Sequence, residues 1–322
     1  MLPDVRSVVI EDGNLALRER PTPTPGPGDV LVEVVAAGVN AADLLQRRGL
    51  YPPPPGAPAD VPGLELAGVV VARGDGVDPE WDGRRVCAVV GGGGQSTHAV
   101  VAAEHLIPVP AHVDWDEAGG FAEAFLTAHD ALVAQARLAP GEHVVVSGAA
   151  GGVGSAAVQI AHRRGARVSA VTRTRDHHDE LLSLGAERAL TIDEVDDLPP
   201  VDAVLELVGP AHLERVVPRL APGGRVVVIG IGSGAEARID LRRVMAQRLT
   251  LTGSTLRARA REEKADVTSR ATADLWEAWD AGAIRVPVQS RFALDEVAGA
   301  YEAFARPGKF GKVILRTGAA PR

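Results

Sequence analysis

The sequence predicts an α/β protein in which a mostly β domain accompanies a doubly wound parallel sheet. In the first third of the chain, short β-branched runs are broken by Gly and Pro, as in small antiparallel domains. From about residue 140, nearly continuous Val and Ile strands alternate with amphipathic helices, which is typical of parallel βαβ units. At roughly 150 residues per domain, 322 residues make about two domains, and 46% hydrophobic residues suffice for two cores.

The first domain is expected to be a small antiparallel barrel or sandwich. Its predicted strands are Val30–Ala36, Ala67–Ala72, Val86–Val90 and Ala99–Ala102. A Pro-rich stretch, 51–58, is unsuited to a helix or a central strand, so we expect a surface loop over a cleft. The only cysteine, Cys87, permits no intramolecular disulfide and is interpreted as a small apolar strand residue.

The second domain is expected to hold the parallel sheet, and the tail is expected to return to the first domain. Predicted strands are His143–Ser147, Arg167–Val171, Ala203–Leu207 and Arg225–Ile229, and predicted helices are Val153–Arg164, His177–Leu184 and Leu213–Leu220. The tail contains predicted helices at Ala271–Asp280 and Leu294–Phe304 and predicted strands at Val286–Val288 and Lys312–Leu315. We therefore predict a discontinuous arrangement: 1–118 and 257–322 in one domain, 119–256 in the other.

The charge and the absence of long apolar runs exclude several classes of protein. A formal charge of −8 disfavours binding to nucleic acid, which depends on neutralising phosphates. The sequence lacks the apolar segment of a signal peptide and any run long enough to span a membrane. We expect a cytoplasmic protein that acts on a small molecule and binds neither nucleic acid nor a membrane.

A glycine-rich turn after the first strand of the parallel sheet predicts a dinucleotide site. The strand His143–Ser147 leads into the turn 148–154 and then into a helix, which is the context that this fingerprint requires. Ala149 stands where the pattern has its first glycine, and Gly148 can relax the turn. The residues expected to bind the cofactor here are Ala150, Gly151, Gly152, Val153 and Gly154. The alternative is a glycine-rich turn that binds nothing.

The end of the second strand favours NADPH over NADH. Arg173, Thr174 and Arg175 stand where a carboxylate would bond the ribose diol of NAD, and cations with hydroxyls suit a 2′-phosphate. Asp176 partly offsets this positive field. Val208 and Gly230, which follow later strands, are also predicted to contact the cofactor.

Several motifs carry a resemblance to a known family over essentially the whole chain. They include Asn40-Ala-Ala-Asp-Leu-Leu-Gln-Arg47, Gly63-Leu-Glu65, Ala149-Ala-Gly-Gly-Val-Gly154, Ser254-Thr-Leu-Arg257 and Gly308-Lys-Phe-Gly-Lys312. The chain resembles the zinc-free quinone oxidoreductase branch of the medium-chain dehydrogenase/reductase superfamily, most closely its p53-inducible subgroup. The resemblance implies a GroES-like catalytic domain, a Rossmann nucleotide-binding domain, and a homodimer formed through the edge of the nucleotide-domain sheet.

The resemblance also implies that no metal is bound. Zinc-dependent relatives carry a cysteine where Asn40 stands and a histidine where Leu64 stands, and their four-cysteine lobe is missing here. Neither an amide nor an aliphatic side chain is a usual zinc ligand. A quinone needs less help than a simple carbonyl, because its conjugated ring accepts hydride readily.

The function implied is an NADPH-dependent quinone oxidoreductase. By resemblance, Asn40 and Thr127 contact the nicotinamide end or order water near it, and Tyr51 lines the substrate mouth. Lys312 is assigned to the cofactor, with a structural role equally open, and the run Arg257–Arg261 is interpreted as a solvated helix start or as a neighbour of the cofactor. Two alternatives remain: an enoyl-thioester or activated-alkene reductase with Tyr51 as the acid, and a non-enzymatic NADPH-binding sensor.

Overall fold

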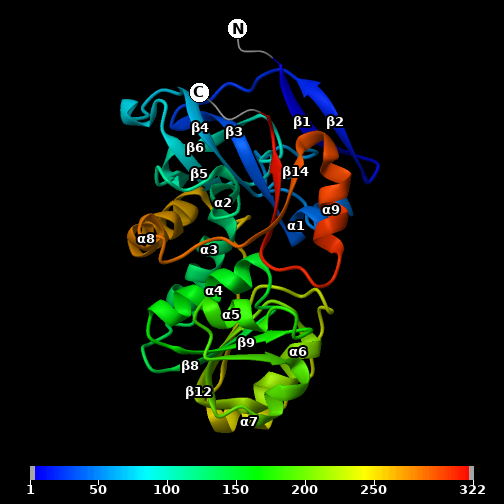
Figure 1. Ribbon diagram of the computed structural model, residues 1–322, viewed down its shortest axis with the longest axis vertical. Coiled ribbons are helices and arrows are strands. Elements are labelled where there is room, and N and C mark those ends of the chain that lie inside the picture. Colours follow the sequence, from blue (N-terminus) through cyan, green and yellow to red (C-terminus); the bar gives the residue numbers. More distant parts are fainter. Residues whose placement is uncertain (1–3, 319–322) are drawn as a thin grey trace. The chain divides into compact units, whose positions relative to one another are not determined.

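The structure is a computed structural model that describes residues 4–318. The described residues form two compact units (Figure 1). The first contains 4–123, 256–307 and 311–318, and the second contains 124–255 and 308–310. The predicted fold class is confirmed, because the first unit is mostly β and the second is built on a parallel sheet. Across residues 4–318, no helix combines the length and apolar character that a membrane crossing requires.

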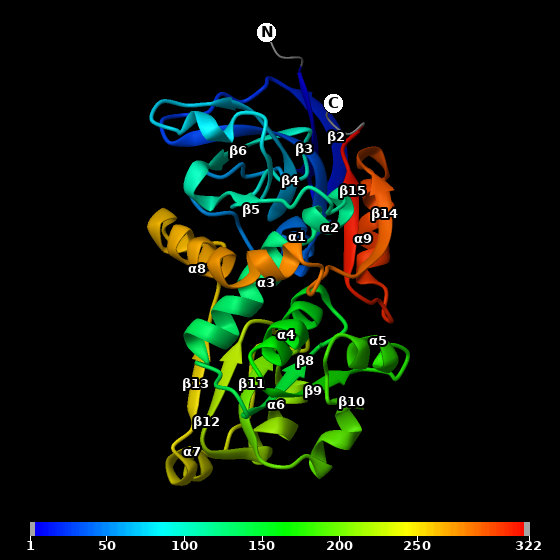
Figure 2. The same ribbon diagram turned by 60° about the vertical axis from the view of Figure 1, so that its left-hand side comes forward.

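The first unit is built around a mixed sheet with strand order β14-β15-β3-β4-β5-β7, in which β6 also pairs with β3. Its strands are β3 (Asp29–Val39), β4 (Glu65–Arg73), β5 (Arg85–Val89), β6 (His98–Ala102), β7 (Ile107–Pro108), β14 (Val288–Ala293) and β15 (Lys312–Arg316), beside a hairpin of β1 (Val5–Glu11) and β2 (Asn14–Arg20). Its helices include α1 (Ala41–Arg47), α2 (Trp115–Gly119), α8 (Arg261–Asp280) and α9 (Val297–Ala305). The antiparallel pairing of β15 with β3 places this C-terminal strand on the sheet, and β14 pairs in parallel with the other side of β15 (Figure 2).

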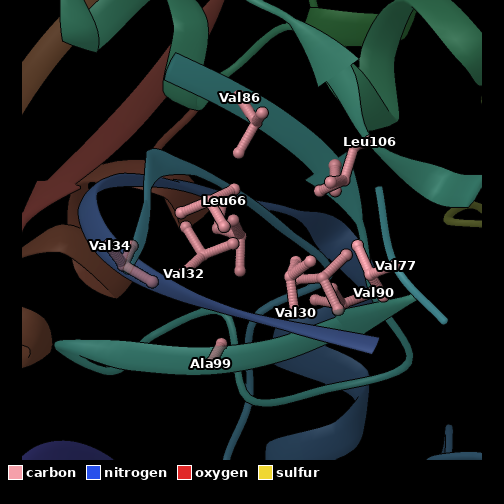
Figure 3. Packing of buried hydrophobic residues seen from close by; sticks show 12 residues of the cluster. Val30, Val32, Val34, Leu66, Val77, Val86, Val90, Ala99 and Leu106 are labelled. Carbon is pink, nitrogen blue, oxygen red and sulfur yellow. The ribbon is translucent and has the colours of Figure 1, made fainter. Parts of the chain in front are cut away.

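Strand β3 runs through the centre of this unit because nearly all of its side chains are apolar and buried. Val30, Val32 and Val34 alternate along one face and pack against Leu66 of β4 (Figure 3). Cys87 of β5 is buried as well, which confirms its interpretation as an apolar strand residue. The close packing of this core fixes the ends of β3 and β4, where the polar residues described below begin.

The second unit is a parallel sheet with strand order β10-β9-β8-β11-β12-β13. Its strands are β8 (His143–Ser147), β9 (Arg167–Thr172), β10 (Arg188–Thr191), β11 (Val201–Glu206), β12 (Leu220–Val228) and β13 (Thr250–Gly253); its helices include α4 (Gly152–Arg163), α5 (His178–Ser183), α6 (Pro210–Val216) and α7 (Leu241–Gln247). Figure 1 shows helices above and below these strands. The strand order reverses between β8 and β11, and ligands of such sheets bind at the carboxyl ends of the strands at this point.

The structure corrects several predicted elements. Helix α8 begins at Arg261 rather than at residue 271, because its polar first half still buries Val267 and Thr268. Helix α6 begins at Pro210 and ends at Val216, since Pro218 cannot continue it and β12 starts at Leu220. Strands β1, β2, β10 and β13 lack the long apolar runs on which the sequence predictions relied.

Candidate functional site

The glycine turn of the second unit lies at the carboxyl end of β8. Gly148 has a φ of 58°, which favours glycine, and Gly151 caps α4 without any side-chain hydrogen bond. A Cβ atom on Gly154 would lie 2.4 Å from the Gly148 carbonyl oxygen, so only glycine allows α4 to start this close to the strand. The predicted residues 150–154 therefore occupy the turn and the first turn of α4, where backbone amides suit an anion.

The other predicted cofactor residues of this unit lie at the same edge of the sheet. Val208 follows β11, and Gly230 follows β12. A Cβ atom on Gly230 would lie 2.3 Å from the Leu207 carbonyl oxygen, so glycine allows the loops after these two strands to approach each other. Glu206, which sequence reasoning missed, ends β11 with its carboxylate fully buried. The available signal was a carboxylate within the apolar strand predicted at Ala203–Leu207.

The predicted phosphate-binding residues follow β9 and are exposed. Arg175 pairs with Glu194, and the Thr174 hydroxyl donates to Asp176 at 2.8 Å. Within the part of the chain that the structure describes, Arg173 forms no ion pair. Of the two guanidinium groups, Arg173 is therefore the one whose charge is not already partnered by a carboxylate.

In the first unit, Asn40 and Lys312 meet in a buried polar cluster with Glu65. The Lys312 ammonium donates to the Asn40 Oδ1 atom at 2.6 Å and to the Glu65 carboxylate, while the Asn40 Nδ2 atom donates to Glu65 at 2.9 Å. The second oxygen of Glu65 accepts the Glu123 backbone N–H at 2.9 Å. Lys312, predicted to bind the cofactor, thus lies buried in the first unit, and Glu65 is a further residue that sequence reasoning missed. Among residues 4–318, no three His, Cys, Asp or Glu side chains gather in a way that could hold a metal ion.

Asp43 extends this cluster from the first turn of α1. Its carboxylate accepts the backbone N–H of Asn40 at 2.8 Å and that of Gly63 at 3.1 Å, and Gln95 donates to it at 3.3 Å. Burial raises the pKa of Asp43 from 3.8 to about 7, although these backbone hydrogen bonds oppose the rise. Gln95 accepts in turn from the Tyr301 hydroxyl at 2.9 Å.

Tyr51 is held by Arg257, a residue placed differently from the sequence interpretation. Arg257 is buried and is not part of a solvated helix start; its guanidinium donates to the carbonyl oxygens of Gly91 at 2.8 Å and Tyr51 at 3.0 Å, and to the Gln46 side chain at 2.5 Å. It also lies 5.1 Å from the centre of the Tyr51 ring, within the range of a cation–π contact. Burial raises the pKa of Tyr51.

The three predicted catalytic residues are distributed over both units. Asn40 and Tyr51 belong to the first, at opposite ends of α1, whereas Thr127 lies almost fully buried in α3 (Ala122–His129), in the part of that helix assigned to the second unit. The geometry within the first unit thus joins Asn40 to Lys312, and Tyr51 to Arg257.

Comparisons with known proteins identify the family. Residues 26–137 match the alcohol dehydrogenase GroES-like domain family, and residues 152–272 match the zinc-binding dehydrogenase family. Rat quinone oxidoreductase is 30% identical over 297 residues, which cover 89% of this chain and 88% of the rat protein. The chain belongs to the quinone oxidoreductase branch of the medium-chain dehydrogenases/reductases. It is an oxidoreductase, and this family uses a nicotinamide cofactor.

Two further matches show the range of proteins related to this medium-chain dehydrogenase/reductase. An alcohol dehydrogenase superfamily protein from Novosphingobium aromaticivorans has a TM-score of 0.87 and 28% identity, over 98% of this chain and 100% of that structure. A segment of a phenolphthiocerol/phthiocerol polyketide synthase from Mycobacterium tuberculosis is 40% identical over 210 residues, which is 62% of this chain but 10% of the synthase. The closer assignment to the p53-inducible subgroup stays a prediction.

Proposed function

We propose that this protein is an NADPH-dependent quinone oxidoreductase that works without a metal ion. The observation that carries the proposal is the buried Asn40–Glu65–Lys312 cluster, in which an ammonium group lies among the oxygen atoms. The similarity to quinone oxidoreductases supports the same activity. The reaction is a hydride transfer from the nicotinamide to a quinone or a similar conjugated acceptor.

The residues at the expected metal position do not fit zinc. The Asn40 side chain is already committed to Lys312 and Glu65, and Leu64 is a buried aliphatic residue. The Lys312 ammonium satisfies the Glu65 carboxylate, so a divalent cation there would face a buried positive charge. Without a Lewis acid, a conjugated acceptor is favoured over a simple alcohol or ketone, because delocalisation stabilises the charge it gains.

The second unit offers a donor set that fits a dinucleotide. The uncapped N-terminus of α4 and the close approach at Gly154 suit a diphosphate, and the carboxyl ends of β8 and β11 frame the position. A bound nicotinamide would supply the hydride. Arg173 would bind the 2′-phosphate that distinguishes NADPH from NADH, with Thr174 and Arg175 as its neighbours.

The first unit would bind and orient the acceptor. Tyr51, fixed by Arg257, would line the acceptor site with an aromatic face and a hydroxyl group. By the resemblance, Asn40, whose amide is fixed by Lys312 and Glu65, would contact the nicotinamide end or order water near it, and Thr127 of the second unit would have the same role. Solvent supplies the protons that a reduced quinone takes up.

A steady-state screen tests this proposal. Quinones, enals, enones, alcohols and ketones would be assayed with NADPH and with NADH, before and after treatment with a chelator. We expect turnover of quinones with NADPH that the chelator leaves unchanged. Loss of that activity on chelation, or restoration of it by zinc, would contradict the metal-free mechanism.

A second candidate is reduction of an enoyl-thioester or another activated alkene, favoured by the 40% identical polyketide synthase segment. That reaction needs a placed acid for the α-carbon, and Tyr51 is the candidate. Tyr51→Phe that keeps quinone turnover but abolishes alkene reduction would support it. Tight NADPH binding with no turnover of any acceptor would instead favour a sensor.

The parallel sheet also supports a homodimer. In the described residues β13 pairs only with β12, so its other edge presents unpaired N–H and C=O groups. Leu251 on this strand and Leu241 and Met245 on α7 expose apolar side chains nearby. Joining two such edges across a two-fold axis would satisfy the backbone groups and cover the apolar ones.

A further inference from the structure

A buried carboxylate joins two strand ends in the second unit. Glu206, the last residue of β11, accepts three hydrogen bonds on its Oε1 atom: from the Ser147 hydroxyl at 2.8 Å and from the backbone N–H groups of Val208 at 2.7 Å and Gly209 at 2.8 Å. Its Oε2 atom lies 2.6 Å from the Nδ1 atom of His212 on α6. Both side chains are almost completely buried.

The position of this cluster links it to the cofactor. Ser147 is the last residue of β8 and directly precedes the glycine turn, and its hydroxyl also accepts the Leu207 backbone N–H at 2.6 Å. Strands β8 and β11 are neighbours at the point where the strand order reverses. One carboxylate therefore fixes both loops that follow these strands, the turn 148–151 and the loop 207–209.

The loop 207–209 needs such support because its conformation is unusual. Gly209 has a φ of 109°, and the Val208 carbonyl accepts the Ser233 N–H at 2.8 Å. A loop at the carboxyl end of this strand meets a bound dinucleotide through its main chain, so its backbone geometry sets how well the nucleotide fits.

A histidine at position 212 destabilises the fold if its only role is to fill space. Its Nε2 atom is buried and has no hydrogen-bond partner among the described residues, and a buried polar atom without a partner costs about 1–3 kcal/mol. An apolar side chain would fill the space without that cost. Burial acts to raise the pKa of Glu206, but the hydrogen bond from His212 and the two backbone N–H groups outweigh it, so the pKa lies below its ordinary value. His212 thus keeps Glu206 ionised, as an acceptor of all four hydrogen bonds.

We propose that His212 and Glu206 form a positioning pair that holds the loop 207–209 and Ser147 in the geometry that binds the nicotinamide nucleotide. The inference uses the cofactor site of the proposed function but not its acceptor. Neither side chain contacts the reacting atoms. The pair acts on nucleotide affinity through the backbone that it fixes.

The test compares nucleotide binding in three variants of the full-length protein. His212→Leu removes the donor and keeps the volume, His212→Asn keeps an N–H near the Nδ1 position, and His143→Leu is the matched control. His143 is a buried histidine at the opposite end of β8, where it bonds Ser169 at 2.8 Å. The Kd of NADPH and of NADH is measured by fluorescence titration, and thermal unfolding of each variant is measured in parallel.

We expect His212→Leu to weaken nucleotide binding about tenfold, a loss of roughly 1.4 kcal/mol. His212→Asn should restore the Kd to within about threefold of wild type, and His143→Leu should leave it unchanged despite a comparable loss of thermal stability. The KM for the nucleotide should rise in His212→Leu, while kcat at saturation stays within about twofold.

An unchanged Kd in His212→Leu, or an equal loss in His143→Leu, would overturn the inference. Should His212→Leu fail to fold, Ser147→Ala gives the same information, because it cuts the link between Glu206 and the Leu207 N–H; an unchanged Kd there is equally decisive. The proposed function is judged separately by the wild-type protein. Binding with no turnover of quinones contradicts that function alone, whereas binding of neither nucleotide contradicts both.

Discussion

Asp43 couples the stability of the first unit to pH. Its pKa is about 7 in the folded protein against an ordinary value of 3.8, with burial as the first cause. Between these values the folded state binds one proton more than the unfolded state, so stability is highest at the acidic side and falls as pH rises toward 7. Each pH unit within this window removes up to about 1.4 kcal/mol. Well above pH 7 the carboxyl is ionised in both states, and this contribution no longer changes.

Asp43→Asn should flatten this dependence. We expect the free energy of unfolding in urea to fall between pH 5 and pH 7 more steeply in the wild type than in the variant. Asp60→Asn is the control, because its hydrogen bond from Arg20 lowers the pKa of Asp60 and moves its titration below this range. Parallel pH profiles of wild type and Asp43→Asn would mean that burial does not keep this carboxyl protonated.

Arg173 is expected to decide the choice of nucleotide. Because it is exposed and its charge meets no carboxylate among the described residues, Arg173→Ala should weaken NADPH binding about tenfold and leave NADH binding unchanged. NADH serves as the internal control for damage to the site. If Arg173→Ala weakens the binding of both nucleotides equally, or of neither, Arg173 does not bind the 2′-phosphate.

At the scale of elements, Arg257 ties three segments of the first unit together. Its guanidinium serves acceptors on the 51–58 loop, on the glycine stretch 91–94 and on α1. Arg257→Gln should lower the free energy of unfolding by about 2–4 kcal/mol, because buried acceptors lose a charged donor. It should also raise the KM for a quinone more than it lowers kcat, since the Tyr51 loop loses its anchor.

Arg261→Gln is the matched control for this prediction. Arg261 forms ion pairs with Asp29 and Glu104, but its side chain is 41% exposed, so its loss should cost less than about 1 kcal/mol and leave the KM unchanged. Urea denaturation and steady-state kinetics of both variants measure the difference. If the two variants behave alike, burial gives Arg257 no special role.

Elements with local signals could be predicted from the sequence, whereas side chains with distant partners could not. Strand β8 and helix α4 were predicted almost to the residue, because a continuous Val run and a glycine turn are local signals. Glu65 and Arg257 were not predicted as site residues, since their partners lie far away in the chain: Lys312 follows Glu65 by 247 positions, and Arg257 follows Gln46 by 211. A local pattern carries no information about such pairs.

At the scale of the whole molecule, the open edge of β13 predicts the oligomeric state. Leu251→Lys places a charge on that edge, where a paired strand from a second copy would bury it without a partner. We expect the wild type to be a dimer and Leu251→Lys to be a monomer with the same fold, as measured by light scattering after size exclusion and by circular dichroism.

Leu182→Lys provides the control for this experiment, because Leu182 is similarly exposed, 44% against 37% for Leu251, but lies on α5 beside β10, at the opposite edge of the sheet from β13. A charge at Leu182 should leave the dimer intact, which separates a specific edge contact from a general effect of added charge. A wild-type monomer, or dissociation by both variants alike, would contradict pairing through β13. Nucleotide affinity should survive in the Leu251→Lys monomer, because the glycine turn and the Glu206 cluster lie at the ends of β8 and β11 and not on this edge.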